Sequence, residues 1–552
     1  MLSSHTPPDI KIVPIAKRPV APSKEQLPSP TSTGVSKKVS YRNPSRTSTG
    51  LADGAAKLKY KPGKWDIWML GITIVIGGQY ISWNAGIAAG LYTYLICYFV
   101  IASAYVTLCC CTSEITGGLP FAGGAYGLAR CTLGFLPAFL IGCCEALEYI
   151  VYVSTSVISL ADVIVEVSPS LRSAKPLIWA LFYISALYVH IKGDRVFWIF
   201  NLVIGSTSIL IVVIFVFGSL PFVDYTAYAH QPSLNLVDGF AGLLKVLPLA
   251  CWFFVGVEAL NLASDQVTQP KQCIPYAQTR CVVTLFVTGI MVFFVTVSLP
   301  PGLASLPTEL VPLNNGFEPL FNMSHTNATI LSLPATLLPV FLSRATTTSG
   351  TPYMAITFGS ALSYIICLVV YFVPTVSKYL FNVCITAAFM SYTGQCVGYI
   401  SLKMNYRNIK SSYFHSPFGI LGALYSMSVW ILCIVSIIGF QGNGGQEIMI
   451  FGIVIACLTV YYYAWARKRQ TFSPQENRIM LVAHVMKFNG RRAAGAGQKR
   501  KRGSKNNSGK TTNNNSRFTN AESTHMVGSS STVGVSKVTT FFARRTGRST
   551  NN

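Results

Sequence analysis

Charged side chains are scarce in this chain. Asp, Glu, Lys and Arg make up 11% of its 552 residues, whereas 51% are hydrophobic. Soluble domains carry roughly a quarter charged residues, so the composition excludes an ordinary soluble protein. No nucleophile, phosphate-binding or metal-ligand motif stands out in the polar segments, and the 15 cysteines lack zinc-site or redox-motif context. We therefore expect no enzyme activity, no cofactor and no metal site.

Long apolar stretches are abundant instead. A helix needs about 20 apolar residues to cross a bilayer. The first 64 residues are polar and rich in Pro, Ser and Lys, so we expect no cleavable signal peptide before these stretches. The sequence predicts an all-α polytopic membrane protein with eleven clear spans, at roughly 67–89, 91–113, 135–160, 176–191, 196–220, 243–263, 281–299, 353–373, 379–402, 418–440 and 447–466.

A twelfth stretch, 330–342, is too short for a normal span. It covers only about 20 Å as a helix, and Pro334 and Pro339 would kink or end it. Without this eighth crossing, every later loop changes sides and the basic carboxyl tail lies outside, against the positive-inside rule. Either neighbouring loop residues help the stub to cross, or residues are missing near 335–338, which is the preferred interpretation. We expect about 12 spans, with the eighth truncated and 11 full.

The formal net charge of +24 lies in the two tails. Residues 1–64 and 467–552 together hold 30 of the 43 Lys and Arg and 5 of the 19 acidic residues. Low apolar content predicts that both tails are largely disordered and that they flank a membrane domain at 65–466. The basic run 499–502 resembles a nucleic-acid patch, but attraction to anionic membrane lipid is the simpler account. We expect no nucleic-acid partner, and a short interfacial helix at 474–488.

Charge also predicts orientation. With the amino terminus inside and twelve crossings, basic loops such as those at Arg130 and Lys271 fall on the cytosolic side. The loop at 300–329 then lies outside, where the tripeptides beginning at Asn322 and Asn327 are weak candidates for glycosylation. We expect both tails to be cytosolic and the plasma membrane to be the location.

The first apolar stretch contains a signal for a broken helix. Gly77 and Gly78 lie at its centre and are followed by the amide Gln79. Unwound backbone inside a membrane survives only where it is paired or lines a cavity, and broken helices form the substrate site of many secondary transporters. The alternative is that these glycines only let two helices pack closely.

Three motifs carry a family resemblance. The segment 113–130 holds an acid, a proline, a glycine pair and an aromatic residue before a basic one, namely Glu114, Pro120, Gly123, Gly124, Tyr126 and Arg130. The segment 252–261 reads Trp-Phe-Phe-Val-Gly-Val-Glu-Ala-Leu-Asn and is followed by Pro-Lys at 270–271. With the first span, they occur in the order seen in amino acid–polyamine–organocation permeases, which residues 62–466 resemble. Trp83-Asn84 and the segment 145–149 are most similar to the ethanolamine-permease branch.

The resemblance implies a fold of two inverted five-helix repeats plus two further helices. Spans one and six would be broken at the substrate site, where half-helix ends offer N–H groups and carbonyls. It assigns Gly77, Gly78 and Gln79 to the first-span part of the site. It assigns Trp252, Phe253 and Gly256 to the sixth-span part, with an aromatic ring capping the substrate.

Acidic residues inside spans are costly and therefore candidates for function. The resemblance makes Glu258, just after the sixth-span break, the candidate for proton coupling. Glu145 and Glu148 lie three residues apart and share one helix face, where they either neutralise an ammonium substrate or pair with a neighbouring helix. Glu114 and Asp265 lie nearer the predicted cytosolic side, where solvation is the simpler explanation of their charge.

The sequence thus favours a secondary active transporter of amino acids or small amines such as ethanolamine, coupled to H+ or working by exchange. Two alternatives stay open. One is a nutrient sensor with a permease-like body that signals through its tails, and the other is an inactive permease that lacks its eighth span.

Overall fold

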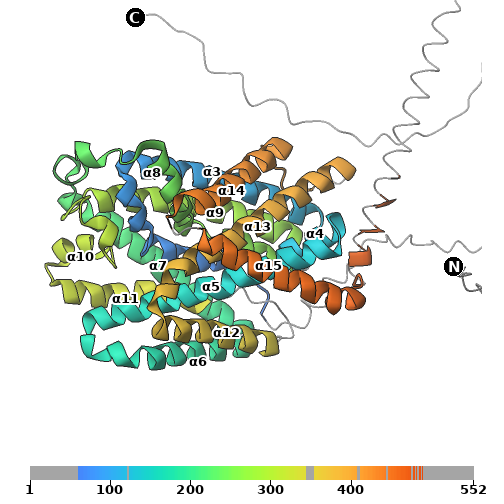
Figure 1. Ribbon diagram of the computed structural model, residues 1–552, viewed down its shortest axis with the longest axis horizontal. Helices are drawn as coiled ribbons and strands as arrows, with labels where there is room; N and C mark the ends of the chain where they lie inside the picture. Colours follow the sequence, from blue (N-terminus) through green and yellow to red (C-terminus); the bar gives the residue numbers. More distant parts are fainter. Residues whose placement is uncertain are drawn as a thin grey trace, which may run out of the picture.

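The computed structural model is a bundle of helices, with no strand among the residues that it describes (Figure 1). Those residues are 60–120, 123–342, 353–406, 411–442, 445–473 and short pieces between 476 and 488. The predicted amino-terminal tail up to residue 59 and the basic run 499–502 lie outside them. The division into tails and a membrane domain therefore stays a prediction.

Nine helices in the described ranges are long and apolar enough to cross a membrane. A tenth candidate span is a pair of helical segments, 239–253 and 257–265, bent by 40° at a short break. The chain is therefore a multi-pass integral membrane protein, while the count of twelve spans stays a prediction. The nine helices are α3 (Leu91–Gly118), α5 (Phe135–Val167), α6 (Lys175–Lys192), α7 (Asp194–Ser219), α9 (Pro270–Val297), α12 (Tyr353–Phe372), α13 (Ser377–Asn405), α14 (Gly419–Phe440) and α15 (Gln446–Ala464).

The first predicted span is divided into three helical pieces. Helix α2 (Lys64–Val75) begins where the Asp66 carboxylate accepts a hydrogen bond from the Gly63 N–H, at 2.8 Å. It ends directly before the short 3₁₀ helix η1 (Ile76–Gln79), which contains the two glycines that the sequence singled out. Ser82 then adopts a left-handed conformation with φ of 74°, and the 3₁₀ helix η2 (Trp83–Ala89) follows. Glycines stabilise an α-helix poorly, which accounts for the end of α2 at this point.

The sixth predicted span is also interrupted. Helix α8 (Gly239–Val246) continues into the 3₁₀ helix η7 (Leu247–Phe253), and a second 3₁₀ segment, η8 (Val257–Asp265), follows the break. Gly256 lies in the break with φ of +99°. A residue with a Cβ atom rarely adopts this conformation, so any other residue at position 256 would strain the backbone of the break.

The eighth stretch forms a longer helix than its hydropathy predicts. Helix α11 (His325–Leu342) begins in the polar residues before 330 and continues through Pro334 and Pro339. Its 18 residues correspond to about 27 Å, close to the hydrocarbon thickness of about 30 Å. α11 packs against α2, η1 and α5, so the eighth stretch lies beside the first span. Whether residues are missing near 335–338 stays a prediction.

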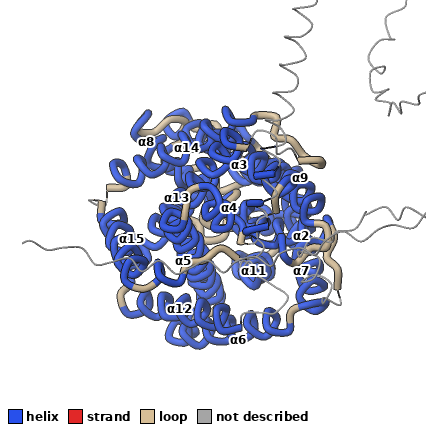
Figure 2. Tube along the Cα trace, turned by 90° about the vertical axis from the view of Figure 1, so that its right-hand side faces the viewer, coloured by secondary structure: helices blue, strands red, loops and turns tan. Residues whose placement is uncertain are grey.

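The two ends of the bundle carry different short helices. Helix α4 (Gly124–Thr132) lies at one end, which we call the α4 end, and α10 (Asn314–Phe321) lies at the other, the α10 end (Figure 1). The α4 end is the predicted cytosolic side. In the end-on view, α5, α11 and α13 lie toward the centre, and α6, α12 and α15 lie toward the rim (Figure 2).

Candidate functional site

The two helix breaks touch each other inside the bundle. A methyl group in place of a Gly78 hydrogen would lie 1.8 Å from the Trp252 carbonyl oxygen. A methyl group at Gly256 would lie 2.7 Å from the Ile74 Cγ2 atom. Only glycine fits at positions 78 and 256, where spans one and six cross. The first span therefore breaks at its glycine pair, and Gly78 also lets it pack closely against the sixth span.

Gln79 faces away from the sixth span. Its side-chain Nε2 donates a hydrogen bond to the Leu285 carbonyl of α9, at 3.0 Å, and the residue is fully buried. Its Oε1 atom has no hydrogen-bond partner among the described residues. Gln79 thus ties η1 to α9, and Gly77, next to it, is only partly buried.

The two sixth-span aromatics point to different surroundings. The Trp252 ring stacks on Phe381 of α13, with centroids 4.8 Å apart, and its centroid lies 5.9 Å from that of Tyr152 on α5. Phe253 instead packs against Trp83 at 5.1 Å and Tyr98 at 4.9 Å. Trp252 therefore contacts the α5 face that carries the predicted acids, whereas Phe253 belongs to an aromatic cluster with Trp83.

Glu258 and Glu148 come together at the centre of the bundle. The Glu258 carboxylate accepts hydrogen bonds from the Tyr149 hydroxyl at 2.8 Å and the Gly256 N–H at 3.2 Å. Glu148 accepts one from the Tyr392 hydroxyl of α13 at 2.7 Å. Because Glu148 and Tyr149 are neighbours on α5, these bonds place the two carboxyl groups near each other. A buried carboxylate is costly unless it is protonated or paired with a cation.

No basic partner neutralises these acids among the described residues. Glu148 is fully buried, Glu258 is 2% exposed and Glu145 is 7% exposed. The ion pairs of the described residues involve other acids: Glu114, Asp162, Glu166, Glu318 and Glu476. The Oε2 atom of Glu148 also has no hydrogen-bond partner in this part of the chain. Sequence reasoning predicted all three acids, which we call the acid cluster, but it missed Tyr392, because a lone tyrosine in a span carries no signal.

Little free volume lies between the helices at the α4 end. A cavity of about 20 Å³ lies there between α3, α4, η8 and α13, and Asn261, Thr116 and Gln395 are among its lining residues. This volume holds about one water molecule. The Thr116 hydroxyl donates to the Asn261 Oδ1 atom at 3.2 Å, so the described side chains pack closely on this side.

Glu114 is paired, which corrects the expectation that solvent accounts for its charge. It is 8% exposed. Its carboxylate accepts hydrogen bonds from the Tyr399 hydroxyl at 2.7 Å and the Ser416 N–H at 3.3 Å, and it forms an ion pair with Lys403 at 2.5 Å. Glu114 therefore joins α3 to α13 and to the start of α14.

The rest of the 113–130 motif shapes the turn into α4. Gly123 and Gly124 have φ of +77° and +52°, which a glycine adopts without strain. Pro120 is buried in the turn. The Arg130 guanidinium donates to the Tyr126 hydroxyl at 2.7 Å, within the same helix.

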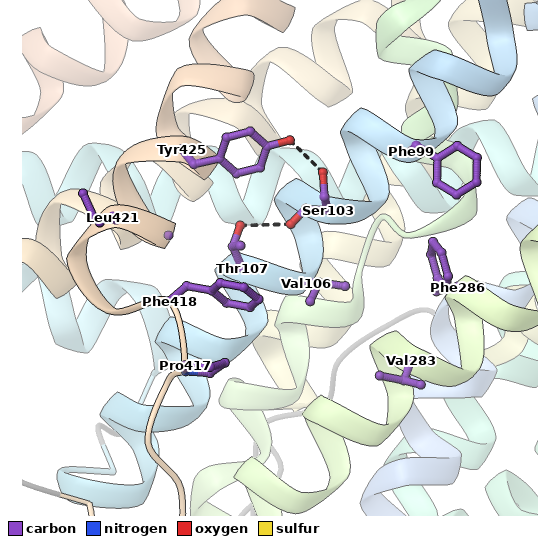
Figure 3. A pocket seen from close by; sticks show the side chains of 11 residues that line it. Phe99, Ser103, Val106, Thr107, Val283, Phe286, Pro417, Phe418, Leu421 and Tyr425 are labelled. Carbon is purple, nitrogen blue, oxygen red and sulfur yellow. Dashed lines mark hydrogen bonds between the residues drawn. The ribbon is translucent and has the colours of Figure 1, made fainter. Parts of the chain in front are cut away.

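A larger groove lies elsewhere and is not the candidate site. It has a volume of about 730 Å³ and lies between α3, α9 and α14 (Figure 3). Its lining is almost entirely apolar, apart from groups such as the Ser103 and Tyr425 hydroxyls, which are 2.7 Å apart. Phe99 and Leu421 on its rim are exposed, as expected for a surface that faces lipid. None of the residues predicted for the substrate site lines it.

Asn322 and Asn327, the candidate glycosylation sites, are both exposed at the α10 end. Their exposure is compatible with modification. The side of the membrane on which this end lies stays a prediction.

Two broken spans that meet beside buried acids suggest a solute site rather than a structural bundle, and comparison with known proteins bears on this point. Residues 63–335 match the family described as amino acid permease. The matched part is just under half of the chain, and it includes both breaks and the acid cluster.

Individual relatives are distant. An uncharacterized transporter of Rhizobium meliloti (strain 1021) is 26% identical over 251 residues, covering 43% of this chain and 53% of that protein. The branched-chain amino acid permease BcaP of Bacillus subtilis (strain 168) is 26% identical over 244 residues, covering 40% and 51%. The methylthioribose transporter of the same strain is 25% identical over 255 residues, covering 43% and 54%. The chain thus spans about half the length of the curated relatives it matches.

Proposed function

We propose that this protein is a secondary active transporter of amino acids or small amines, and that the acid cluster receives the substrate ammonium group. The observation that supports this most strongly is that Glu148 and Glu258 are buried with no basic partner among the described residues. An ionised carboxylate in a membrane interior costs several kcal/mol unless it is paired. A proton or an ammonium group removes that cost, and the cluster can exchange one for the other.

The broken helices suit the remainder of such a substrate. The backbone around Gly78 and Gly256 is not part of a regular α-helix, so N–H groups and carbonyls there are available to polar groups of a ligand. Trp252 lies between this backbone and Tyr152, where its ring can cover a bound solute. An ammonium group over an aromatic face gains roughly 0.5–2 kcal/mol.

The same geometry supports a mechanism for proton coupling. If a proton bridges Glu148 and Glu258 when no amine is bound, the arrival of an ammonium group displaces it. Loading and unloading of substrate are then linked to proton release and uptake. Ethanolamine belongs on the list of candidate substrates because of the branch resemblance, but Trp83 and Asn84, which carry part of it, lie away from the acids. Asn84 donates to the Leu306 and Glu309 carbonyls, at 2.7 and 2.8 Å.

A ligand panel on the purified protein tests the proposal. Thermal stabilisation is measured with leucine, ethanolamine, arginine and putrescine, and with N-acetyl-leucine as the matched control that lacks an ammonium group. Methylthioribose, for which one relative is named, tests the sugar-like alternative. We expect at least one free amine to stabilise the protein and N-acetyl-leucine to have no effect. Stabilisation by methylthioribose alone, or equally by leucine and its acetyl derivative, would contradict the ammonium site.

A further inference from the structure

We propose that the segment just after the last span is a latch that holds α4 against the bundle and slows opening of the site toward the α4 end. The latch consists of Gln470, Thr471, Phe472 and Glu476, and its receptor is Arg130. The consequence for transport rests on the proposed function, whereas the docking itself does not.

Arg130 is held mainly by the latch. Its guanidinium donates to the Gln470 side chain at 3.1 Å and to the Thr471 carbonyl at 2.5 Å. Its Nε atom forms an ion pair with Glu476 at 2.7 Å. Arg130 is only 8% exposed, so these charge-assisted contacts are shielded from water and are stronger than surface ion pairs.

Aromatic packing completes the contact. The Phe472 ring lies 4.7 Å from that of Phe135, the first residue of α5. The Arg130 guanidinium lies over both rings, at 5.7 and 5.1 Å from their centroids. The latch therefore fastens the end of α4 to the start of α5. The start of the predicted interfacial helix at 474–488 thus contributes Glu476 to a protein contact.

The position of α4 explains why fastening it matters. α4 packs on η8, which carries Glu258, as well as on α5 and α13. Gly124 lies so close that a methyl group there would be 2.9 Å from the Leu262 Cδ2 atom of η8. The cavity of about 20 Å³ described above lies between these same elements. A solute can leave toward the α4 end only if α4 and η8 separate, and the latch opposes that movement.

The test compares hydrogen–deuterium exchange of the α4 amides in the full chain and in Glu476→Gln. The substitution keeps the shape of the side chain but removes its charge. Because charge-assisted hydrogen bonds are about twice as strong as neutral ones, we expect exchange in 124–132 to accelerate about tenfold or more. Phe472→Ala is expected to act in the same direction. Arg478→Gln, an exposed residue in the same helical piece, is the matched control and should leave exchange unchanged.

Uptake into liposomes supplies the second measurement. Once a transported amine is known, Glu476→Gln should raise its maximal rate, because separation of α4 and η8 becomes easier. Unchanged α4 exchange in Glu476→Gln would overturn the latch, and so would faster exchange without any change in uptake rate. If the unaltered chain transports nothing, the proposed function fails, and the exchange data still decide whether the segment docks on Arg130.

Discussion

Replacement of Glu258 by Gln is the most informative change at the acid cluster. The carboxylate accepts one hydrogen bond from Tyr149 and one from the Gly256 N–H in the helix break. Glutamine keeps the shape but offers only one acceptor oxygen, so one of these donors loses its partner. It also cannot share a proton with Glu148. Losing a buried hydrogen-bond partner costs about 1–3 kcal/mol of folding free energy, so the variant should melt at a lower temperature than the unaltered chain.

The effect on coupling separates this account from a purely structural role. We expect Glu258→Gln to remove the dependence of amine uptake on external pH in proteoliposomes, because the proton exchanged by the pair is gone. The protein should still reach the membrane and fold, as judged by size-exclusion chromatography. Asp265→Asn, on the same segment η8 but outside the cluster, is the matched control and should keep the pH dependence. Uptake by Glu258→Gln that still follows external pH as in the unaltered chain would refute the reasoning.

Three further predictions concern packing, pH and orientation. Gly78→Ala should destabilise the protein by about 3 kcal/mol or more, because its methyl group would meet the Trp252 carbonyl. Gly359→Ala is the control, since it has open space around it. Equal melting temperatures of the two variants would argue against close contact between the two helix breaks. The pKa of His325 is raised, first by its hydrogen bond to Glu166, so the stabilisation from this contact is complete below about pH 6.5 and is lost as pH rises through the raised value. His325→Gln should therefore flatten the decline of the melting temperature above neutral pH, and an unchanged slope would exclude this contact as its cause. Tags at the two chain ends should both be degraded by protease added on the cytosolic side, and protection of one end alone would contradict an even number of spans.

Much of the membrane bundle could be predicted from hydropathy. The nine uninterrupted candidate spans coincide with predicted stretches because a bilayer requires long apolar helices. The break at Gly78 was also predictable, since glycine disfavours a regular helix. The break at Gly256 was expected from the family resemblance of the segment 252–261. Hydropathy failed at α11, whose first turn is polar. Its packing against α2 and α5 stabilises residues that a membrane alone would not hold in a helix.

The partners of the predicted site residues were not predictable in the same way. Glu145, Glu148 and Glu258 stand out as acids in apolar spans, and that signal is local. Tyr392 and Phe381 lie on a helix distant in sequence, so only the packing of α13 on α5 brings them to the site. Likewise, the contact of Arg130 with Glu476 joins residues far apart in the chain, and the sequence suggested only an interfacial helix at 474–488 in an otherwise disordered tail.

Uptake of a labelled amine by the purified chain in liposomes tests the central claim most directly. The account predicts that an inward proton gradient drives accumulation of at least one free amine above its external concentration. It also predicts that collapsing the gradient abolishes this accumulation and that N-acetyl-leucine does not compete. Absence of accumulation for every amine tested, or accumulation that ignores both the gradient and the ammonium group, would contradict it.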